Sequence, residues 1–134
     1  MPRTVKAIYI NPKFNTVVQT NLEVKEDNDF ELEQCYKLIG CDLVEFVYTR
    51  NREILVVDEE GLLKDLDNQS FFKIEGIGQE VFARSGILIK IDNTEYEIPI
   101  DYDIEDFKSQ YTVEFPTVEI LKEKRTKRRT RTTW

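Results

Sequence analysis

The sequence predicts an α+β fold, in which a mainly antiparallel sheet is covered by one principal helix and a short second helix follows. Three observations lead to this prediction. Short β-branched or aromatic runs recur along the chain, separated by Gly, Pro, Asn or Asp. One segment, residues 28–40, has a clear helical pattern. The length of 134 residues favours a single domain. We place that acidic α+β domain at residues 1–121 and a basic C-terminal tail at residues 122–134.

The first elements are two strands and the principal helix. Residues 6–10 and 15–20 predict antiparallel strands, with a break between them at Asn11-Pro12. The helix then begins with Asn28 as a cap and Glu31 as the second residue of a capping box. Its apolar residues are spaced to form one stripe, which we expect to pack against the strand at residues 43–47: Leu32, Cys35, Tyr36 and Ile39. Gly40 ends the helix, since glycine readily adopts the left-handed conformation.

The remaining elements follow in chain order. A hairpin is predicted from strands at 43–48 and 54–57, joined by a charged loop at 49–53. A tight turn at 58–61 precedes one helical turn at 61–66. Three further strands are expected at 81–84, 87–91 and 96–100, and a helix at 104–111 with Asp103 as its cap. Residues 112–121 form either a last strand or an extended connection, because Pro116 is unsuited to a central strand.

Charge divides the chain into two parts of opposite sign. Residues 1–121 hold twelve Lys or Arg and twenty-five Asp or Glu, a net charge of −13, whereas residues 122–134 hold seven bases and one acid. Clustered cations attract phosphates, and an aromatic side chain can stack on an exposed base. The candidate nucleic-acid-binding residues are Lys124, Arg125, Lys127, Arg128, Arg129, Arg131 and Trp134. Two alternatives remain. In the first, the tail folds back on the acidic body or binds a protein; in the second, it has no partner.

Motifs of established chemistry are absent from the sequence. The chain has no histidine, which removes the commonest general base and metal ligand. Three consecutive carboxylates, Asp58, Glu59 and Glu60, could hold a divalent cation through their oxygens or form a solvated turn, and no fourth ligand at a recognisable spacing supports the cation site. We assign them as candidate partner-binding residues, and we expect no catalytic residue, cofactor or metal site. The apolar runs are too short to cross a membrane, and two cysteines without a secretion signal favour free thiols in the cytoplasm.

One part of the chain resembles a known family. The helix at 32–41 is followed by a strand at 42–47, then by the turn sequence D-E-E-G-L-L within residues 55–64 and by Asn68. A strand at 77–83 completes the order. This order of elements is similar to that of an uncharacterised family of small proteins carried by phages and plasmids. The family pattern has a helix ending in two glycines and an N/D-E-E-G-x-L turn. The resemblance covers roughly residues 5–92, with Cys41 in place of the second glycine and Asp67 in place of a proline.

The resemblance implies a genomic setting and supplies no catalytic residues. We therefore expect a small, non-enzymatic accessory protein of a phage or mobile element in the cytoplasm of a bacterial host. It would bind a host or phage protein through its acidic surface and so inhibit a host-defence or nucleic-acid-handling protein. The alternative is a nucleic-acid-associated protein that uses the basic tail. An enzyme or ligand-sequestering protein with a carboxylate-lined pocket is a third class, and the sequence does not indicate the oligomeric state.

Overall fold

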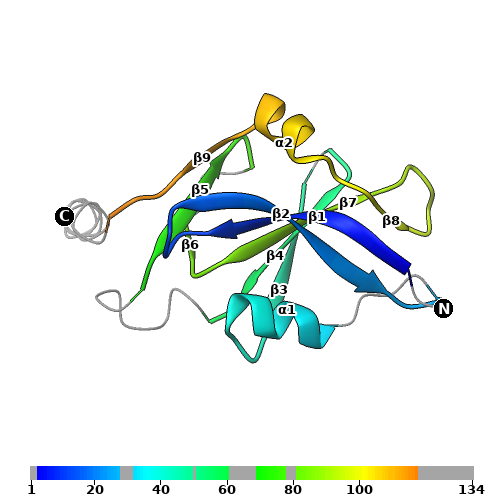
Figure 1. The fold of residues 1–134 in the computed structure, drawn as a ribbon, viewed down its shortest axis with the longest axis horizontal. Coiled ribbons are helices and arrows are strands. Elements are labelled where there is room, and N and C mark those ends of the chain that lie inside the picture. Colours follow the sequence, from blue (N-terminus) through cyan, green and yellow to red (C-terminus); the bar gives the residue numbers. More distant parts are fainter. Residues whose placement is uncertain (1–2, 28–31, 50, 61–68, 78–80, 118–134) are drawn as a thin grey trace, which may run out of the picture.

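The computed structural model describes residues 3–27, 32–49, 51–60, 69–77 and 81–117. Its centre is a six-stranded antiparallel sheet, in which five strands follow the order β2-β1-β7-β4-β3 and β8 pairs with β7 (Figure 1). These strands are β1 (Arg3–Asn11), β2 (Thr16–Val24), β3 (Val44–Tyr48), β4 (Glu53–Asp58), β7 (Gly86–Ile91) and β8 (Pro99–Ile100). The predicted hairpins β1–β2 and β3–β4 are confirmed.

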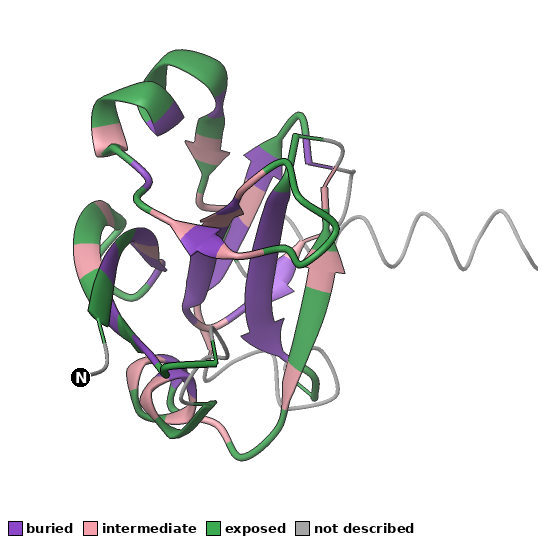
Figure 2. Ribbon diagram, turned by 90° about the vertical axis from the view of Figure 1, so that its right-hand side faces the viewer, coloured by how far each residue is buried: buried purple, intermediate pink, exposed green. Residues whose placement is uncertain are grey.

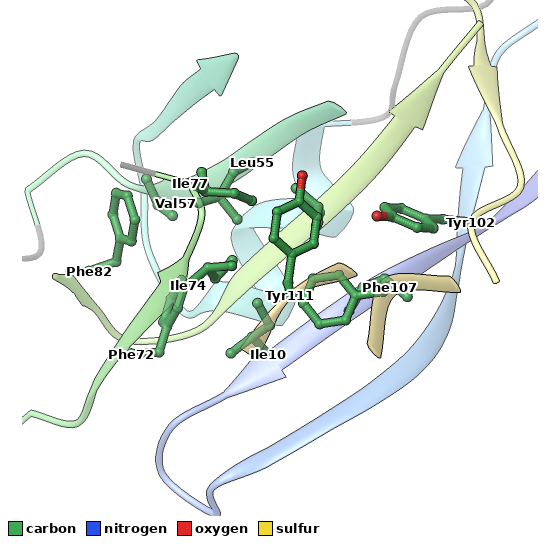
Figure 3. Close-up of a cluster of buried hydrophobic side chains, with 12 residues drawn as sticks. Ile10, Leu55, Val57, Phe72, Ile74, Ile77, Phe82, Tyr102, Phe107 and Tyr111 are labelled. Atoms are coloured by element: carbon green, nitrogen blue, oxygen red, sulfur yellow. The ribbon is translucent and has the colours of Figure 1, made fainter. Parts of the chain in front are cut away.

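The central strands are buried on both faces, which explains their continuous apolar runs. Every residue of β4 is buried, and alternate residues along it belong to different clusters. Figure 2 shows the buried residues gathered in the strands at the middle of the molecule. The α1-side core is formed by Val5, Ala7, Leu22, Val24, Cys35, Ile39, Ile54, Val56, Ile87, Ile89 and Ile91. The α2-side core is formed by Ile8, Ile10, Leu55, Val57, Phe72, Ile74, Ile77, Phe82, Leu88, Tyr102, Phe107 and Tyr111 (Figure 3).

A second sheet of three strands, in the order β6-β5-β9, packs its side chains into the α2-side core. Its strands are β5 (Phe71–Glu75), β6 (Phe82–Ala83) and β9 (Thr112–Glu114). Phe72 of β5 is fully buried, and its ring lies directly on Gly86 of β7. A Cβ atom at Gly86 would lie only 2.5 Å from the Cζ atom of Phe72. This contact therefore requires glycine and joins the two sheets at close range.

The prediction of a sheet covered by one principal helix is wrong. Two short helices are present in the described residues: α1 (Leu32–Ile39) has eight residues and α2 (Ile104–Gln110) has seven. They lie on opposite sides of the main sheet (Figure 1). The architecture is mostly antiparallel sheet, because the aromatic run in β5 forms a second sheet instead of leaving that face to a helix.

The apolar stripe of α1 is buried only in part. Cys35 and Ile39 are buried in the α1-side core, but Leu32 is 38% exposed and Tyr36 is half-buried. The helix contacts β4 and β7 in the middle of the sheet, whereas the expected partner strand β3 is at the edge. Leu32 is the first residue of α1, so its side chain lies beyond the main packing contact. The predicted capping residues at 28–31 are outside the described residues.

Other local predictions are confirmed in part. Gly40 ends α1 with φ of +79°, and the amides of Gly40 and Cys41 both donate to the Tyr36 carbonyl. Asp103 caps α2 by accepting a hydrogen bond from the Glu105 amide at 3.2 Å. The strands expected at 81–84 and 96–100 are only two residues long each, and the helical turn at 61–66 lies outside the described residues. No helix in the described ranges is long and apolar enough to span a membrane.

Candidate functional site

Seven exposed or half-buried carboxylates line one continuous segment of the described structure. This acidic strip consists of Asp92, Glu95, Glu97, Asp101, Asp103, Glu105 and Asp106. Residues 92–106 contain no Lys or Arg. The strip follows the β7–β8 connection, passes β8 and continues into the first turn of α2. All of its members except the half-buried Asp92 are exposed, so the segment itself carries only negative charge. Bases of other elements also reach it, since Arg52 interacts electrostatically with Asp92 and the Arg3 guanidinium contacts the Pro99 carbonyl.

The first part of the strip is a folded loop closed by its own carboxylate. One oxygen of Asp92 accepts hydrogen bonds from the amides of Thr94 and Ile98, both at 3.1 Å, and from the Thr94 hydroxyl at 2.7 Å. The hydrogen bond from Thr94 is the main cause that lowers the pKa of Asp92. The Asp92 amide donates to the Ile98 carbonyl at 2.9 Å. Tyr96, which is 76% exposed, is therefore presented on an ordered loop among carboxylates.

The second part of the strip is fixed along the N-terminal half of β1. The Arg3 guanidinium donates to the Pro99 carbonyl at 2.8 Å, and the Lys6 amide donates to an Asp101 carboxylate oxygen at 2.8 Å. The Tyr102 amide in turn donates to the Lys6 carbonyl at 2.9 Å. Residues 99–102 are thus bound to β1 although they follow it by more than ninety positions.

A buried carboxylate lies beneath the strip and holds its C-terminal end. Glu53, the first residue of β4, is only 2% exposed. Its Oε1 atom accepts hydrogen bonds from the Tyr111 hydroxyl at 2.6 Å and from the Thr49 hydroxyl at 2.9 Å, and its Oε2 atom accepts one from Tyr102. The Asn51 side-chain amide donates to the Tyr111 hydroxyl at 2.7 Å. We call these five residues the Glu53 cluster.

Both phenols of the Glu53 cluster are held in the protonated form that donates to the carboxylate. Burial, followed by the hydrogen bond to Glu53, raises the pKa of Tyr111 to about 12. The same two causes raise the pKa of Tyr102. Lys90 of β7 is the strand partner of Glu53, and its ammonium lies 5.3 Å from the centre of the Tyr102 ring. The ring positions of Tyr102, Phe107 and Tyr111 are visible in Figure 3.

The Glu53 cluster is suited to anchoring rather than to acid–base chemistry. Three hydroxyls already donate to the carboxylate, so its hydrogen-bonding capacity is largely used within the fold. Tyr102 and Tyr111 flank α2 on both sides, so the cluster fixes the helix whose first turn carries Glu105 and Asp106. Among the described residues, no group of three Cys, Asp or Glu side chains is placed to hold a metal ion.

The turn that sequence reasoning assigned to partner binding contains one buried and two exposed acids. Asp58 is 7% exposed, lies 3.5 Å from the Arg84 guanidinium and accepts a hydrogen bond from the Glu60 amide at 3.0 Å. Glu59 and Glu60 are exposed. The partner-binding assignment of these three residues stays a prediction. The candidate tail residues, from Lys124 to Trp134, lie outside the described residues, and the proposed boundary at residue 122 is likewise untested.

A shallow, open pocket of about 530 Å³ lies at the end of α1 and is lined by Tyr36, Lys37, Gly40, Cys41, Asp42 and Arg84. Arg84 has a left-handed backbone, with φ of +68°, and its guanidinium donates to the Gly40 carbonyl. Lys37 and Arg84 are opposed there by Asp42, so charge alone favours no ligand class. Burial, with a smaller contribution from Cys41, raises the pKa of the neighbouring Cys35 thiol to about 11. Cys35 is therefore a protonated packing residue at neutral pH.

A family model described as a domain of unknown function (DUF3846) matches residues 5–112. The chain belongs to this family. No curated protein and no solved structure significantly matches this chain. The match confirms the predicted membership of an uncharacterised family and extends beyond the expected residue 92 to include α2.

The DUF3846 domain therefore contains both the acidic strip and the Glu53 cluster, while residues 122–134 lie beyond the match. The sequence predicted binding through an acidic surface without locating it at residues 92–106, and Glu53 was expected in a charged loop. The only local signal was the apolar run that follows Glu53 directly in β4. Its partners Tyr102 and Tyr111 are 49 and 58 positions away, so no local pattern indicated them.

Proposed function

We propose that this DUF3846 protein is a non-enzymatic accessory protein of a phage or mobile element, which binds a partner protein in the cytoplasm of a bacterial host through its acidic strip. The observation that carries the proposal is the strip itself: seven carboxylates on fifteen residues without a base, fixed by Asp92, β1 and the Glu53 cluster. Glu59 and Glu60 are further exposed carboxylates, which follow the opposite end of β4 from Glu53.

The excess of carboxylates in the strip favours a basic partner. A surface of one charge sign accelerates association with a complementary surface and disfavours partners of like charge. Because the strip is held by hydrogen bonds in the free protein, little ordering entropy is lost on binding. Proteins that handle nucleic acid carry cationic grooves for phosphates. We therefore propose that the partner is a host-defence or nucleic-acid-handling protein, whose groove the strip would occupy.

Neutralising part of the strip should weaken partner binding by about tenfold, because exposed charge pairs contribute about 0.2–1 kcal/mol each. The test variant combines Glu95→Gln, Glu105→Gln and Asp106→Asn. Its matched control combines Glu33→Gln, Glu75→Gln and Glu114→Gln, which are equally exposed and change the net charge by the same amount. A host protein captured from bacterial lysate is identified by mass spectrometry, purified and titrated against both variants. Equal affinities would reject the strip as the binding surface.

The alternative is association with nucleic acid through the tail, and the charge of residues 122–134 favours it. We expect the full chain to bind labelled oligonucleotides with little sequence preference, and a chain ending at residue 121 not to bind. Affinity should fall by roughly three decades between about 50 and 200 mM salt if most of the seven cations contact phosphates. Equal binding by both chains would place the nucleic-acid site in the acidic domain and contradict the charge argument.

A further inference from the structure

The outer edge of β3 carries unpaired backbone groups in the described structure. β3 ends the strand order of the main sheet, and no described strand pairs with its outer side. Two hydrogen bonds define the inner side: the Thr49 amide donates to the Glu53 carbonyl, and the Glu59 amide donates to the Leu43 carbonyl. Because hydrogen bonding alternates along an antiparallel strand, the odd-numbered residues face β4. The amides and carbonyls of Val44, Phe46 and Tyr48 therefore point outward.

Large apolar side chains accompany these outward backbone groups. Phe46 is 40% exposed and Tyr48 is 60% exposed. They pair with Val56 and Ile54 of the α1-side core, so both project from the face of the sheet that α1 covers. Exposed aromatic residues on a sheet edge favour pairing with another strand, which natural monomers usually prevent.

The opposite edge of the same sheet shows such protection. At β2, the side-chain amide of Gln34 accepts from the Glu23 amide and donates to the Glu23 carbonyl, each at 2.8 Å. The Gln34 side chain therefore occupies the backbone positions that an added strand would use. Gln19 of β2 also accepts a hydrogen bond from the Ile104 amide at 3.3 Å. Among the described residues, β3 has no comparable contact on its outer edge.

We propose that β3 is a homodimer interface, at which the β3 strands of two copies pair antiparallel about a twofold axis and extend the main sheet across both. In the register in which Phe46 faces itself, Val44 of each copy faces Tyr48 of the other. This register uses every outward backbone group of β3 and places an aromatic beside a β-branched side chain, a favourable cross-strand pair. A strand paired with itself in this way forms a closed interface and no filament.

The charges of β3 are compatible with self-pairing. Glu45 is its only charged residue, and in this register it faces Val47 rather than the second Glu45. The net charge of −7 opposes association of two copies, and a five-residue strand gives a small interface. The dimer should therefore dissociate on dilution and become tighter with salt, which screens the repulsion. Binding through the acidic strip should respond to salt in the opposite direction, so the two surfaces are tested separately.

Sedimentation velocity of the full chain over about a hundredfold range of concentration tests the proposal by mass action. The unmodified protein should shift from monomer to dimer. Phe46→Lys and Phe46→Glu should each remain monomeric, because like charges would meet at the twofold axis, while an equimolar mixture of the two should form a heterodimer. Phe14→Lys, at a residue 67% exposed in the β1–β2 turn, is the matched control and should dimerise normally.

Circular dichroism checks that each variant is folded, and Tyr48→Lys replaces Phe46→Lys if the latter unfolds. Four results would overturn the proposal. These are a monomeric unmodified protein throughout the range, undiminished dimerisation of the folded Phe46→Lys or Tyr48→Lys variant, a mixture that stays monomeric, and assemblies larger than a dimer.

Discussion

Replacing Glu53 with alanine should lower the free energy of unfolding by about 2–5 kcal/mol, because each buried hydroxyl left without an acceptor costs about 1–3 kcal/mol. The substitution removes the common acceptor of Tyr102, Tyr111 and Thr49. Tyr102 is 1% exposed and Tyr111 is 9% exposed, so water replaces the lost carboxylate poorly. Urea titration followed by circular dichroism measures the change. The control Glu75→Ala, at an exposed acid, should change stability by less than about 0.5 kcal/mol.

The pH dependence of unfolding provides a second measurement on the same cluster. The pKa of Tyr111 is raised from 10 to about 12 in the folded protein, so its stabilising contribution is complete below pH 10 and is lost as the pH rises toward 12. The loss of stability over this interval should be smaller in Tyr111→Phe than in the unmodified protein. Equal slopes for the two proteins, or a loss below about 1 kcal/mol for Glu53→Ala, would show that the cluster does not stabilise the fold.

Phe72→Ala should destabilise the protein by about 3–5 kcal/mol, the usual cost of truncating a buried aromatic residue. Phe72 is fully buried in the α2-side core, where its ring centre lies 5.3 Å from that of Phe82 and its ring also lies against Gly86. Gly86→Ala alone should also destabilise, by about 1–3 kcal/mol, because its new methyl group would overlap the Phe72 ring. The two sheets would have to move apart or the ring would have to leave its position.

Combining the two substitutions distinguishes a steric clash from a backbone effect of glycine. In the Phe72→Ala background, the alanine methyl at position 86 enters the space that the ring vacated. Gly86→Ala should then be neutral or stabilising, which reverses its sign in a double-mutant cycle. Urea titrations of the four proteins give the free energies of unfolding for this cycle. An equal loss of stability from Gly86→Ala in both backgrounds would contradict a steric clash with Phe72.

The local elements of the fold could be predicted from the sequence, whereas their covering layers could not. The β1–β2 and β3–β4 hairpins, the Gly40 helix end and the Asp103 cap each depend on neighbouring residues, and each is present. β5 was not recognised, and its aromatic side chains take the place that a principal helix was expected to fill. Which element covers a sheet depends on partners far along the chain, which periodicity does not reveal.

The candidate site was predictable to a similar extent. The number of acids in residues 92–106 can be read from the sequence, but their fixed conformation cannot. It depends on Asp92, which bonds across its own loop, and on the backbone contacts of Lys6 with Asp101 and Tyr102, which lie far apart in the chain. Asp58 and Glu59 are neighbours with identical expectations from sequence. The structure separates them, because Asp58 is the last residue of β4 and lies against Arg84, while Glu59 is in the turn that follows and faces solvent. Glu53 shows the reverse case, in which an acid expected in a loop is buried by two distant tyrosines.

The pairing of β1 with β7 has a consequence for how the protein forms during synthesis. β1 leaves the ribosome before both of its strand partners, and the second of these, from Gly86 to Leu88, follows about eighty residues later. Its last hydrogen-bonding partner on that side is Tyr102. At roughly 5–20 residues per second, the nascent β1–β2 hairpin remains without a completed sheet for several seconds. Translation speed and chaperone access over that interval thus become determinants of yield, and synonymous codon changes between residues 25 and 85 should affect recovery of folded protein without altering its sequence.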